Sequence, residues 1–170
     1  MKILTISGSN RNASTNKKLL EALPILFPKQ DIYGYDKIHE LPLFQADLDK
    51  TPLPKKVKEW RQVVNDVDAV IFCTPEYLHN LPASIKNALE WLTTSGELYG
   101  KSTLAITFTP NAPRGEKAMK SLLWSLQALD AKVMAQFPLY KTDIIFDKKG
   151  NLEESEGRSL LENAIQLLLH

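Results

Sequence analysis

The chain has 170 residues, of which 44% are hydrophobic and 24% are charged, and its formal net charge at pH 7 is +1. This composition is typical of a globular protein long enough to bury a sizeable core, and we expect one domain over residues 1–170. A net charge so close to zero excludes the broad electrostatic field with which proteins bind nucleic acid or membrane surfaces, so any anion site must be local.

The cysteine count and the length of the apolar segments indicate the cellular compartment and whether a metal site is expected. Cys73 is the single cysteine, which excludes an internal disulfide and a cysteine-based metal cluster. The first apolar run is too short for a signal peptide and no segment is long enough to span a bilayer, so we expect a cytoplasmic protein. Several acids lack the spacing of metal ligands and are interpreted as solvated surface, with no metal expected: Asp47, Asp49, Glu153, Glu154 and Glu156.

The first half of the chain alternates between strand and helix patterns. A β-branched run over 2–6 predicts a strand, and apolar residues at helical spacing predict a helix from Ser14 to about Leu26 that kinks or ends at Pro24. A weak strand over 31–35 follows. The proline-rich and acidic residues 39–54 predict an ordered surface loop, and 55–64 predicts a helix.

The second half continues the alternation. Residues 68–73 (DAVIFC) are continuously apolar, which predicts a strand buried on both faces. Helices are predicted over 82–93 and 115–130, strands over 102–108 and 132–137, and a terminal helix after an Asp-to-Gly turn. This order predicts an α/β fold with a parallel sheet covered by helices, and ligands bind such sheets outside the carboxyl ends of the strands. The loops over 7–16, 74–82 and 109–116 lie there.

The opening loop is unusually rich in hydrogen-bond donors. Gly8 lets the backbone turn, and the helix that follows offers free backbone N–H groups and a favourable dipole. An ordinary N-cap by Ser14 or Asn16 would explain one of these polar side chains, whereas a phosphate site explains the whole set: Ser9, Arg11, Ser14, Thr15 and Asn16. Neither G-x-x-x-x-G-K-[ST] nor G-x-G-x-x-G occurs, which favours a terminal phosphate, as in a mononucleotide such as FMN.

The loop over 74–82 follows the buried strand. Pro75 and Pro82 stiffen it, and Tyr77 places an aromatic ring beside the cleft. A stiff backbone with outward N–H groups would suit the edge of a planar heterocycle. An ordinary loop that happens to carry a tyrosine is equally compatible with the pattern.

Two motifs at this separation resemble a known family. The first is G-S-x-R-x-x-S-x-N at 8–16, and the second combines T-P-E-Y at 74–77 with Pro82, Lys86, Asn87, Ala88 and Trp91. The segments LPLFQADLD, DAVIFCTPEY, LYGKSTLAI and FDKKGNL follow the same order. The chain resembles the NADPH-dependent FMN reductases of the flavodoxin-like group, which includes azo-dye, quinone and chromate reductases. The resemblance implies a flavodoxin-like three-layer αβα sandwich with a five-stranded parallel sheet of order 2-1-3-4-5.

The resemblance also implies the cofactors and the residues that hold them. FMN would be bound and NAD(P)H would be the co-substrate. The FMN phosphate would contact Ser9, Arg11, Ser14, Asn16 and the Thr15 backbone. The isoalloxazine ring would lie against residues of the second and third loops: Pro75, Glu76, Tyr77, Leu78, Thr109 and Asn111. Lys86, Asn87 and Trp91 would be structural, and family members are commonly dimers or tetramers in which a neighbouring subunit helps to close the flavin site.

Two departures from the family pattern affect the flavin edge. Leu78, His79 and Asn80 replace the usual asparagine, small residue and serine, and the third loop (TFTPNAPRGEKA) has two prolines and one glycine, Gly115, where the family has a glycine-rich turn. Arg114 and Lys117 lie beside the site, either to attract the extra phosphate of NADPH or as ordinary charges at a helix start.

The implied function is ping-pong hydride transfer from NAD(P)H to bound FMN and on to a flavin, quinone or similar small acceptor. No side-chain acid or base is required, because the flavin carries the chemistry. His79 is more typical of a solvated loop and Cys73 of core packing. Two alternatives stay open: a flavodoxin-type electron carrier, and a relative with weakened or lost flavin binding that serves as a binding module.

Overall fold

The computed structural model describes every residue except 12, 51 and 170. These three positions fall in the opening loop, in the loop over 39–54 and at the end of the terminal helix. All other residues of the opening loop and of the loop over 39–54 are described.

The strands form one parallel sheet. β1 (Lys2–Ser7), β2 (Asp31–Gly34), β3 (Ala69–Thr74), β4 (Ser102–Thr109) and β5 (Lys132–Tyr140) lie in the order β2-β1-β3-β4-β5. This confirms the predicted order 2-1-3-4-5. Every residue of β3 is buried, as its unbroken apolar sequence predicts for a central strand covered on both faces.

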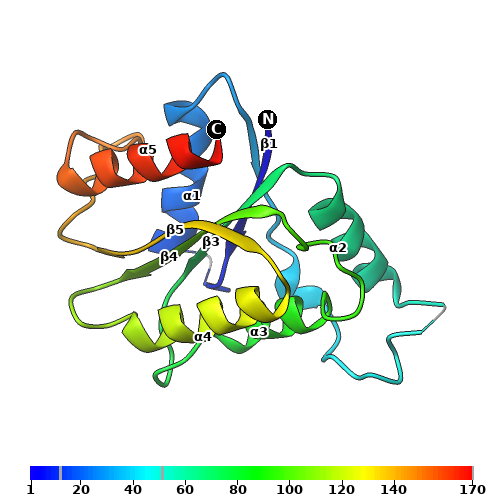
Figure 1. Ribbon diagram of the computed structural model, residues 1–170. Helices are drawn as coiled ribbons and strands as arrows, with labels where there is room; N and C mark the ends of the chain where they lie inside the picture. The colour runs from blue at the N-terminus through cyan, green and yellow to red at the C-terminus, as the bar shows by residue number, and fades with distance from the viewer. Residues whose placement is uncertain (12, 51, 170) are drawn as a thin grey trace.

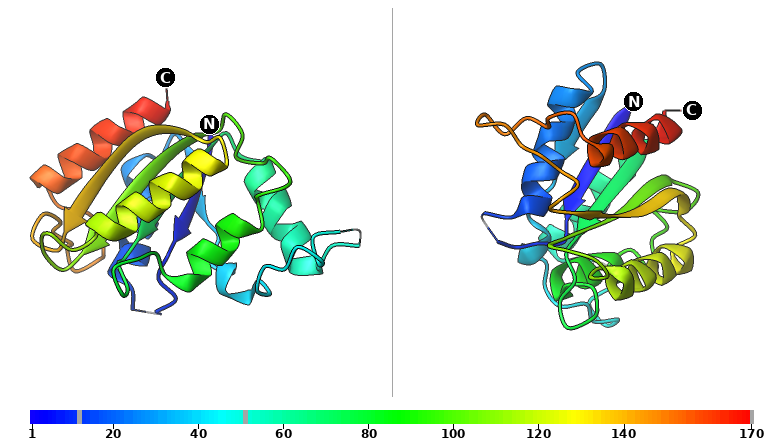
Figure 2. Two further views of the ribbon diagram at one scale, coloured as in Figure 1. Left: turned by 60° about the horizontal axis from the view of Figure 1, so that its bottom comes forward. Right: turned by 90° about the vertical axis from the view of Figure 1, so that its left-hand side faces the viewer.

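Helices cover both faces of the sheet. α1 (Thr15–Leu26) and α5 (Glu156–Leu168) pack on one face, and α2 (Lys55–Asn65), α3 (Ala83–Glu90) and α4 (Glu116–Ala128) on the other, which gives the predicted three layers (Figures 1 and 2). A short 3-10 helix, η1 (Ile38–Glu40), follows β2. Among the described helices, none has the length and apolar character needed to cross a membrane.

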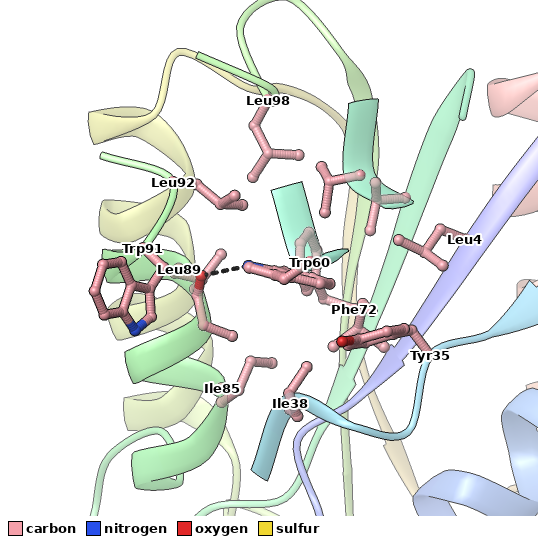
Figure 3. Packing of buried hydrophobic residues seen from close by; sticks show 14 of the residues in the cluster. Leu4, Tyr35, Ile38, Trp60, Phe72, Ile85, Leu89, Trp91, Leu92 and Leu98 are labelled. Atoms are coloured by element: carbon pink, nitrogen blue, oxygen red, sulfur yellow. Dashed lines mark hydrogen bonds between the residues drawn. The ribbon is translucent and has the colours of Figure 1, made fainter. Parts of the chain in front are cut away.

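The core consists of one hydrophobic cluster on each face. Under α2 and α3, the indole of Trp60 is fully buried and its Nε1 donates to the backbone carbonyl of Ala88 at 2.9 Å (Figure 3). The ring of Tyr35 lies 5.3 Å from that indole, centroid to centroid. The opposite cluster joins α1 and α5 through residues such as Leu19, Leu23 and Leu161. The two packed clusters hold the strands in place, and the candidate loops follow the carboxyl ends of these strands.

α1 ends at Leu26 with Pro24 inside it, which confirms the predicted end of this helix. Two other boundaries differ from the sequence expectation by three residues each. α3 ends at Glu90, earlier than predicted. β5 extends to Tyr140 and includes Pro138, which an edge strand tolerates because one side of its backbone has no partner strand.

The loop after η1 is anchored to α3. The Asn87 side chain accepts a hydrogen bond from the backbone N–H of Phe44 at 2.8 Å and donates one to the carbonyl of Pro42 at 3.0 Å. The Trp91 indole donates to the same Pro42 carbonyl at 2.7 Å. These bonds confirm the structural role expected for Asn87 and Trp91.

The interpretation of Asp49 as a solvated acid is wrong. Its side chain is only 4% exposed, and its Oδ1 accepts a 2.7 Å hydrogen bond from Nη2 of Arg61 on α2. The same guanidinium donates to the Trp91 carbonyl, so one buried charge pair ties the loop to two helices. The sequence pattern missed it because the partners are far apart in the chain.

Candidate functional site

The site begins where β1 ends against β3. Gly8 donates its backbone N–H to the carbonyl of Cys73 at 2.8 Å. A Cβ at this position would lie 2.2 Å from the Thr74 hydroxyl and 2.8 Å from its Cβ. Glycine is therefore required because the two strand ends touch, rather than because of a special turn. This close contact brings the first and second loops together.

The amino terminus of α1 presents free backbone donors. Ser14 is the N-cap, and its hydroxyl accepts from the backbone N–H of Lys17 at 3.4 Å. The N–H groups of Thr15 and Asn16 precede the first intrahelical bond, so the helix itself gives them no acceptor. The capping interpretation is thus correct for the Ser14 hydroxyl, while the two N–H groups are left for an anion.

Asn16 has a buried side chain that faces the protein. Its Nδ2 donates to the carbonyl of Phe108 on β4 at 3.0 Å, and its Oδ1 accepts from the thiol of Cys73 at 3.2 Å. The amide therefore fixes the start of α1 over β3 and β4. Asn16 can serve an anion through its backbone N–H, not as the side-chain donor that the resemblance suggested.

Ser9 and Arg11 form the outer part of the same loop. The hydroxyl of Ser9 accepts from the backbone N–H of Arg11 at 3.4 Å, and the Arg11 guanidinium lies 3.5 Å from the Ala13 carbonyl. Arg11 is exposed, and its guanidinium forms no ion pair in the part of the chain that the structure describes. It remains available to bind a phosphate with two parallel hydrogen bonds.

The second loop is a tight turn. Tyr77 and Asn80 exchange both backbone hydrogen bonds, at 3.0 and 2.9 Å, across Leu78 and His79. Both central residues are left-handed, with φ of 49° and 58°. Successive positive φ values are characteristic of a hairpin turn that glycine and asparagine favour, so the leucine is held in a strained conformation.

Glu76 connects the second loop to the third. Its Oε2 accepts from the backbone N–H groups of Gly115, Lys117 and Ala118 at 3.0–3.1 Å, and thereby caps α4 from another segment. Its side chain is 8% exposed, and its Oε1 lies 3.4 Å from Nδ1 of His79. Desolvation opposes ionisation, but the backbone bonds and His79 outweigh it, so the pKa of Glu76 lies below its ordinary value.

The third loop is closed by its own hydrogen bonds. The Thr109 hydroxyl donates to the carbonyl of Arg114 at 2.8 Å, and the Arg114 N–H donates to the carbonyl of Asn111 at 3.1 Å. Gly115 has φ of 104°, and a Cβ there would lie 2.8 Å from the Thr107 hydroxyl. The single glycine of this loop is therefore needed where α4 begins.

The three loops meet around a cavity of about 190 Å³, the candidate flavin cavity. Most of the predicted site residues line it, but Leu78 borders a neighbouring cavity instead, and Asn111 is exposed and lines neither of the two. The described lining is Ser9, Arg11, Ser14, Thr15, Asn16, Pro75, Glu76, Tyr77, Phe108, Thr109, Pro110, Arg114 and Lys141.

Sequence reasoning missed Lys141 as a site residue. It follows β5, and its backbone N–H donates to the carbonyl of Thr109 at 3.1 Å, which places it at the carboxyl edge of the sheet beside the third loop. Its position one residue after a strand was the available signal, but the predicted strand ended too early to show it. Lys141 adds a cation to the flavin cavity.

Cys73 lies beneath the site and is buried. Desolvation raises the pKa of its thiol, so the sulfur stays protonated at neutral pH and donates to Asn16. Core packing, the interpretation favoured from the sequence, is the role that these contacts support.

Comparisons with known proteins give the family context. A family model described as NADPH-dependent FMN reductase matches residues 1–141. The 2-hydroxy-1,4-benzoquinone reductase of a Burkholderia species is 30% identical over 167 residues, covering 95% of this chain and 91% of that protein. The NADH:(hydroxy)cinnamate reductase subunit CrdA of Vibrio ruber is 34% identical over 158 residues, covering 89% of this chain and 77% of that protein.

Solved structures share the fold. FerB, a flavoenzyme NAD(P)H:(acceptor) oxidoreductase from Paracoccus denitrificans, aligns with a TM-score of 0.81 at 22% identity, covering 98% of this chain and 94% of its own. An archaeal flavodoxin aligns with a TM-score of 0.63 at 12% identity over the full length of both chains. These likenesses confirm the flavodoxin-like architecture. The family match over residues 1–141 and the curated relatives show that this chain is an oxidoreductase of the NADPH-dependent FMN reductase family, whose cofactors are FMN and NAD(P)H.

Proposed function

We propose that this protein binds FMN in the flavin cavity and, in a ping-pong sequence, transfers reducing equivalents from NAD(P)H to a quinone, a flavin or a similar small acceptor. The observation that carries the proposal is that free backbone donors of α1 and cationic side chains line the same cavity. The N–H groups of Thr15 and Asn16 and the side chain of Arg11 suit a phosphate dianion.

The residues of the first loop would hold the FMN phosphate. The Ser9 hydroxyl and the Arg11 guanidinium would add to the backbone donors of α1, and Lys141 would supply a second positive charge. The buried Asn16 amide would act indirectly, because it fixes the helix start against β3 and β4. The donor set thus fits a terminal phosphate ester.

The second and third loops would bind the ring. Pro75, Tyr77 and Thr109 line the cavity from β3 and β4, and Glu76 holds the two loops together. Bound FMN would supply the redox chemistry by accepting a hydride and then reducing the acceptor. The protein would orient the ring, exclude water from one of its faces and hold the walls in place.

No side chain of the described lining is proposed as a proton donor. The Glu76 carboxylate is engaged by three backbone N–H groups and ionises readily. His79 points into solvent, with 85% of its side chain exposed. Both observations agree with chemistry carried by the cofactor.

The printed names of the relatives support a small-molecule acceptor. Quinone reductases of Escherichia coli and Pseudomonas putida are 30% and 29% identical to this chain, over 138 and 160 residues. A quinone is therefore the acceptor that we propose to test first, with free flavin second.

We also propose a homodimer that uses α3 and α4. Trp124 on α4 is 69% exposed and borders a groove of about 280 Å³ between the two helices. A large aromatic side chain on an unpaired helical surface is a typical interface anchor. The groove lies along the later turns of α3, the helix that follows the second loop, and of α4.

The test is an FMN titration of the purified protein followed by steady-state NAD(P)H oxidation with a benzoquinone. We expect FMN uptake and turnover. Arg11→Ala should weaken FMN binding by about 1.5–3 kcal/mol, the range of a charge-assisted hydrogen bond, whereas Lys29→Ala, in the turn between α1 and β2, should not. Unchanged FMN affinity in Arg11→Ala would place the phosphate elsewhere.

The same titration separates the alternatives. FMN uptake without NAD(P)H turnover would identify an electron carrier. A protein that takes up no FMN would be a binding module that has lost the flavin. Either result would overturn the proposal.

A further inference from the structure

A second cavity adjoins the flavin cavity on the outer side of Glu76 and Arg114. It has a volume of about 510 Å³ and lies between the turn at Leu78–His79 and the first turn of α4. Glu76 and Arg114 line both cavities, so a molecule in the second one would be next to the flavin ring. The described lining is Glu76, Leu78, His79, Pro113, Arg114, Glu116 and Lys117.

The cations of this second cavity have no ion-pair partner. Arg114 and Lys117 form no ion pair in the described part of the chain. Glu76 forms no ion pair with either of them, and its Oε2 instead accepts from the backbone N–H groups at the start of α4. Glu116 is the remaining acid of the lining, and it is exposed on the first turn of α4.

The backbone donors at the start of α4 are not available to a ligand. Glu76 already occupies those of Gly115, Lys117 and Ala118. At this end of the second cavity, an anion must therefore be bound by the side chains of α4 and of the residues just before it. Arg114 can offer two parallel hydrogen bonds and Lys117 a point charge, which together suit an oxyanion.

The opposite wall is apolar and rigid. Leu78 is 99% exposed and is held in a left-handed conformation by the paired backbone bonds of Tyr77 and Asn80. The strain is maintained at the rim of a cavity beside the candidate site, where strained residues concentrate. Leu78 and Pro113 together offer a nonpolar surface next to the two cations.

We propose that the second cavity binds an oxyanion carried by a substrate of the redox reaction, with Arg114 and Lys117 as its donors. This inference rests on the proposed function, because it assigns the cavity to a molecule that must reach the flavin ring. Two substrates could carry the oxyanion: NADPH, through its 2′-phosphate, or an acceptor with a carboxylate. In either case Lys117 determines specificity.

The test compares Lys117→Gln with Lys120→Gln on FMN-loaded protein. Lys120 is exposed on the same helix and lies outside the lining, so it is the matched control. KM is measured for NADPH and for NADH with a neutral benzoquinone, and for a carboxylated benzoquinone with NADH as donor. Binding of 2′,5′-ADP is measured by calorimetry, with and without FMN.

In Lys117→Gln, the loss of one charge-assisted hydrogen bond should raise the KM of the substrate that carries the oxyanion by about ten-fold or more. If the 2′-phosphate is the ligand, Lys117→Gln raises the KM for NADPH relative to NADH and weakens 2′,5′-ADP binding. If the acceptor is the source, the KM for the carboxylated quinone rises relative to the neutral quinone. Glu116→Gln should shift the same constant in the opposite direction, because it removes the nearby negative charge.

Identical constants in wild type, Lys117→Gln and Lys120→Gln would overturn the inference. That outcome is distinct from failure of the proposed function, in which the wild-type protein takes up no FMN or oxidises no NAD(P)H. The calorimetric titration without FMN tests 2′-phosphate binding even in that case.

Discussion

Glu76 is the residue on which the geometry of the third loop depends. Its carboxylate replaces the N-cap that α4 lacks, since the helix begins at Gly115 without a side-chain cap. Glu76→Ala removes three charge-assisted bonds, two of them partly buried, and leaves the start of α4 without a cap, so we expect a loss of about 2–3 kcal/mol in the free energy of unfolding. Urea denaturation measures it.

The neighbouring acid provides the control. Glu116 is exposed in the first turn of α4, where its charge interacts with the helix dipole through solvent, so Glu116→Ala should cost less than about 1 kcal/mol. Equal losses in the two variants would show that Glu76 contributes no more than a surface charge.

The pKa of Glu76 predicts how this contribution depends on pH. Its pKa is lowered in the folded protein, so the stabilisation is present above the unfolded value of about 4.3 and is lost as the pH falls through the lower folded value. The difference in unfolding free energy between wild type and Glu76→Gln should be constant well above the unfolded pKa and should shrink as the pH falls below it. A difference that grows on acidification would contradict this assignment.

The groove between α3 and α4 is the proposed dimer interface, and a substitution on α4 tests it. Trp124→Glu places a charge at the proposed dimer contact and should shift the protein toward monomer in analytical ultracentrifugation. Ile25→Glu is the matched control, since Ile25 is an apolar residue of α1 that is 61% exposed. If both variants and the wild type sediment alike, the groove is not a subunit interface.

The elements themselves were largely predictable from the sequence. Short apolar runs identified the strands, and apolar residues at helical spacing identified the helices. Both patterns arise because the residues on a buried face must be apolar. The end of β5 was less predictable, because the strand continues through Pro138. Its place at the edge of the sheet makes the proline tolerable, and the sequence does not encode that place locally.

The site was predictable where it depends on local motifs and not where it depends on contacts between loops. Ser14, Thr15 and Arg11, all in the opening loop or at the start of α1, line one cavity, and their contact with a phosphate stays a prediction. Three contacts join segments that are far apart in the chain. Glu76 accepts from the backbone of α4, the Asn16 amide donates to the Phe108 carbonyl, and Gly8 packs against Thr74. Such contacts depend on the strand order, which the resemblance implied but no single motif shows.

At the scale of the whole molecule, the net charge of +1 bears on the choice between an enzyme and an electron carrier. Flavodoxin-type carriers usually present an acidic face to protein partners, and steering by such a face requires a strong local potential. The cations near the flavin cavity, Arg11, Arg114 and Lys141, instead favour small anionic ligands. The overall charge and the local charges therefore agree with a reductase that acts on small molecules.

FMN should stabilise the whole fold, because its proposed site joins three loops from three strands. A ligand that binds the native state alone raises the unfolding free energy by RT ln(1 + [L]/Kd), which is about 2.7 kcal/mol when the ligand is at about 100 times Kd. We therefore expect the melting temperature to rise with FMN concentration, and the rise to be much smaller in Arg11→Ala at the same concentrations. Differential scanning calorimetry measures the shift, with riboflavin as the comparison ligand. Because riboflavin lacks the phosphate, it should protect wild type and Arg11→Ala equally; protection by FMN that is independent of Arg11 would place the phosphate outside the first loop.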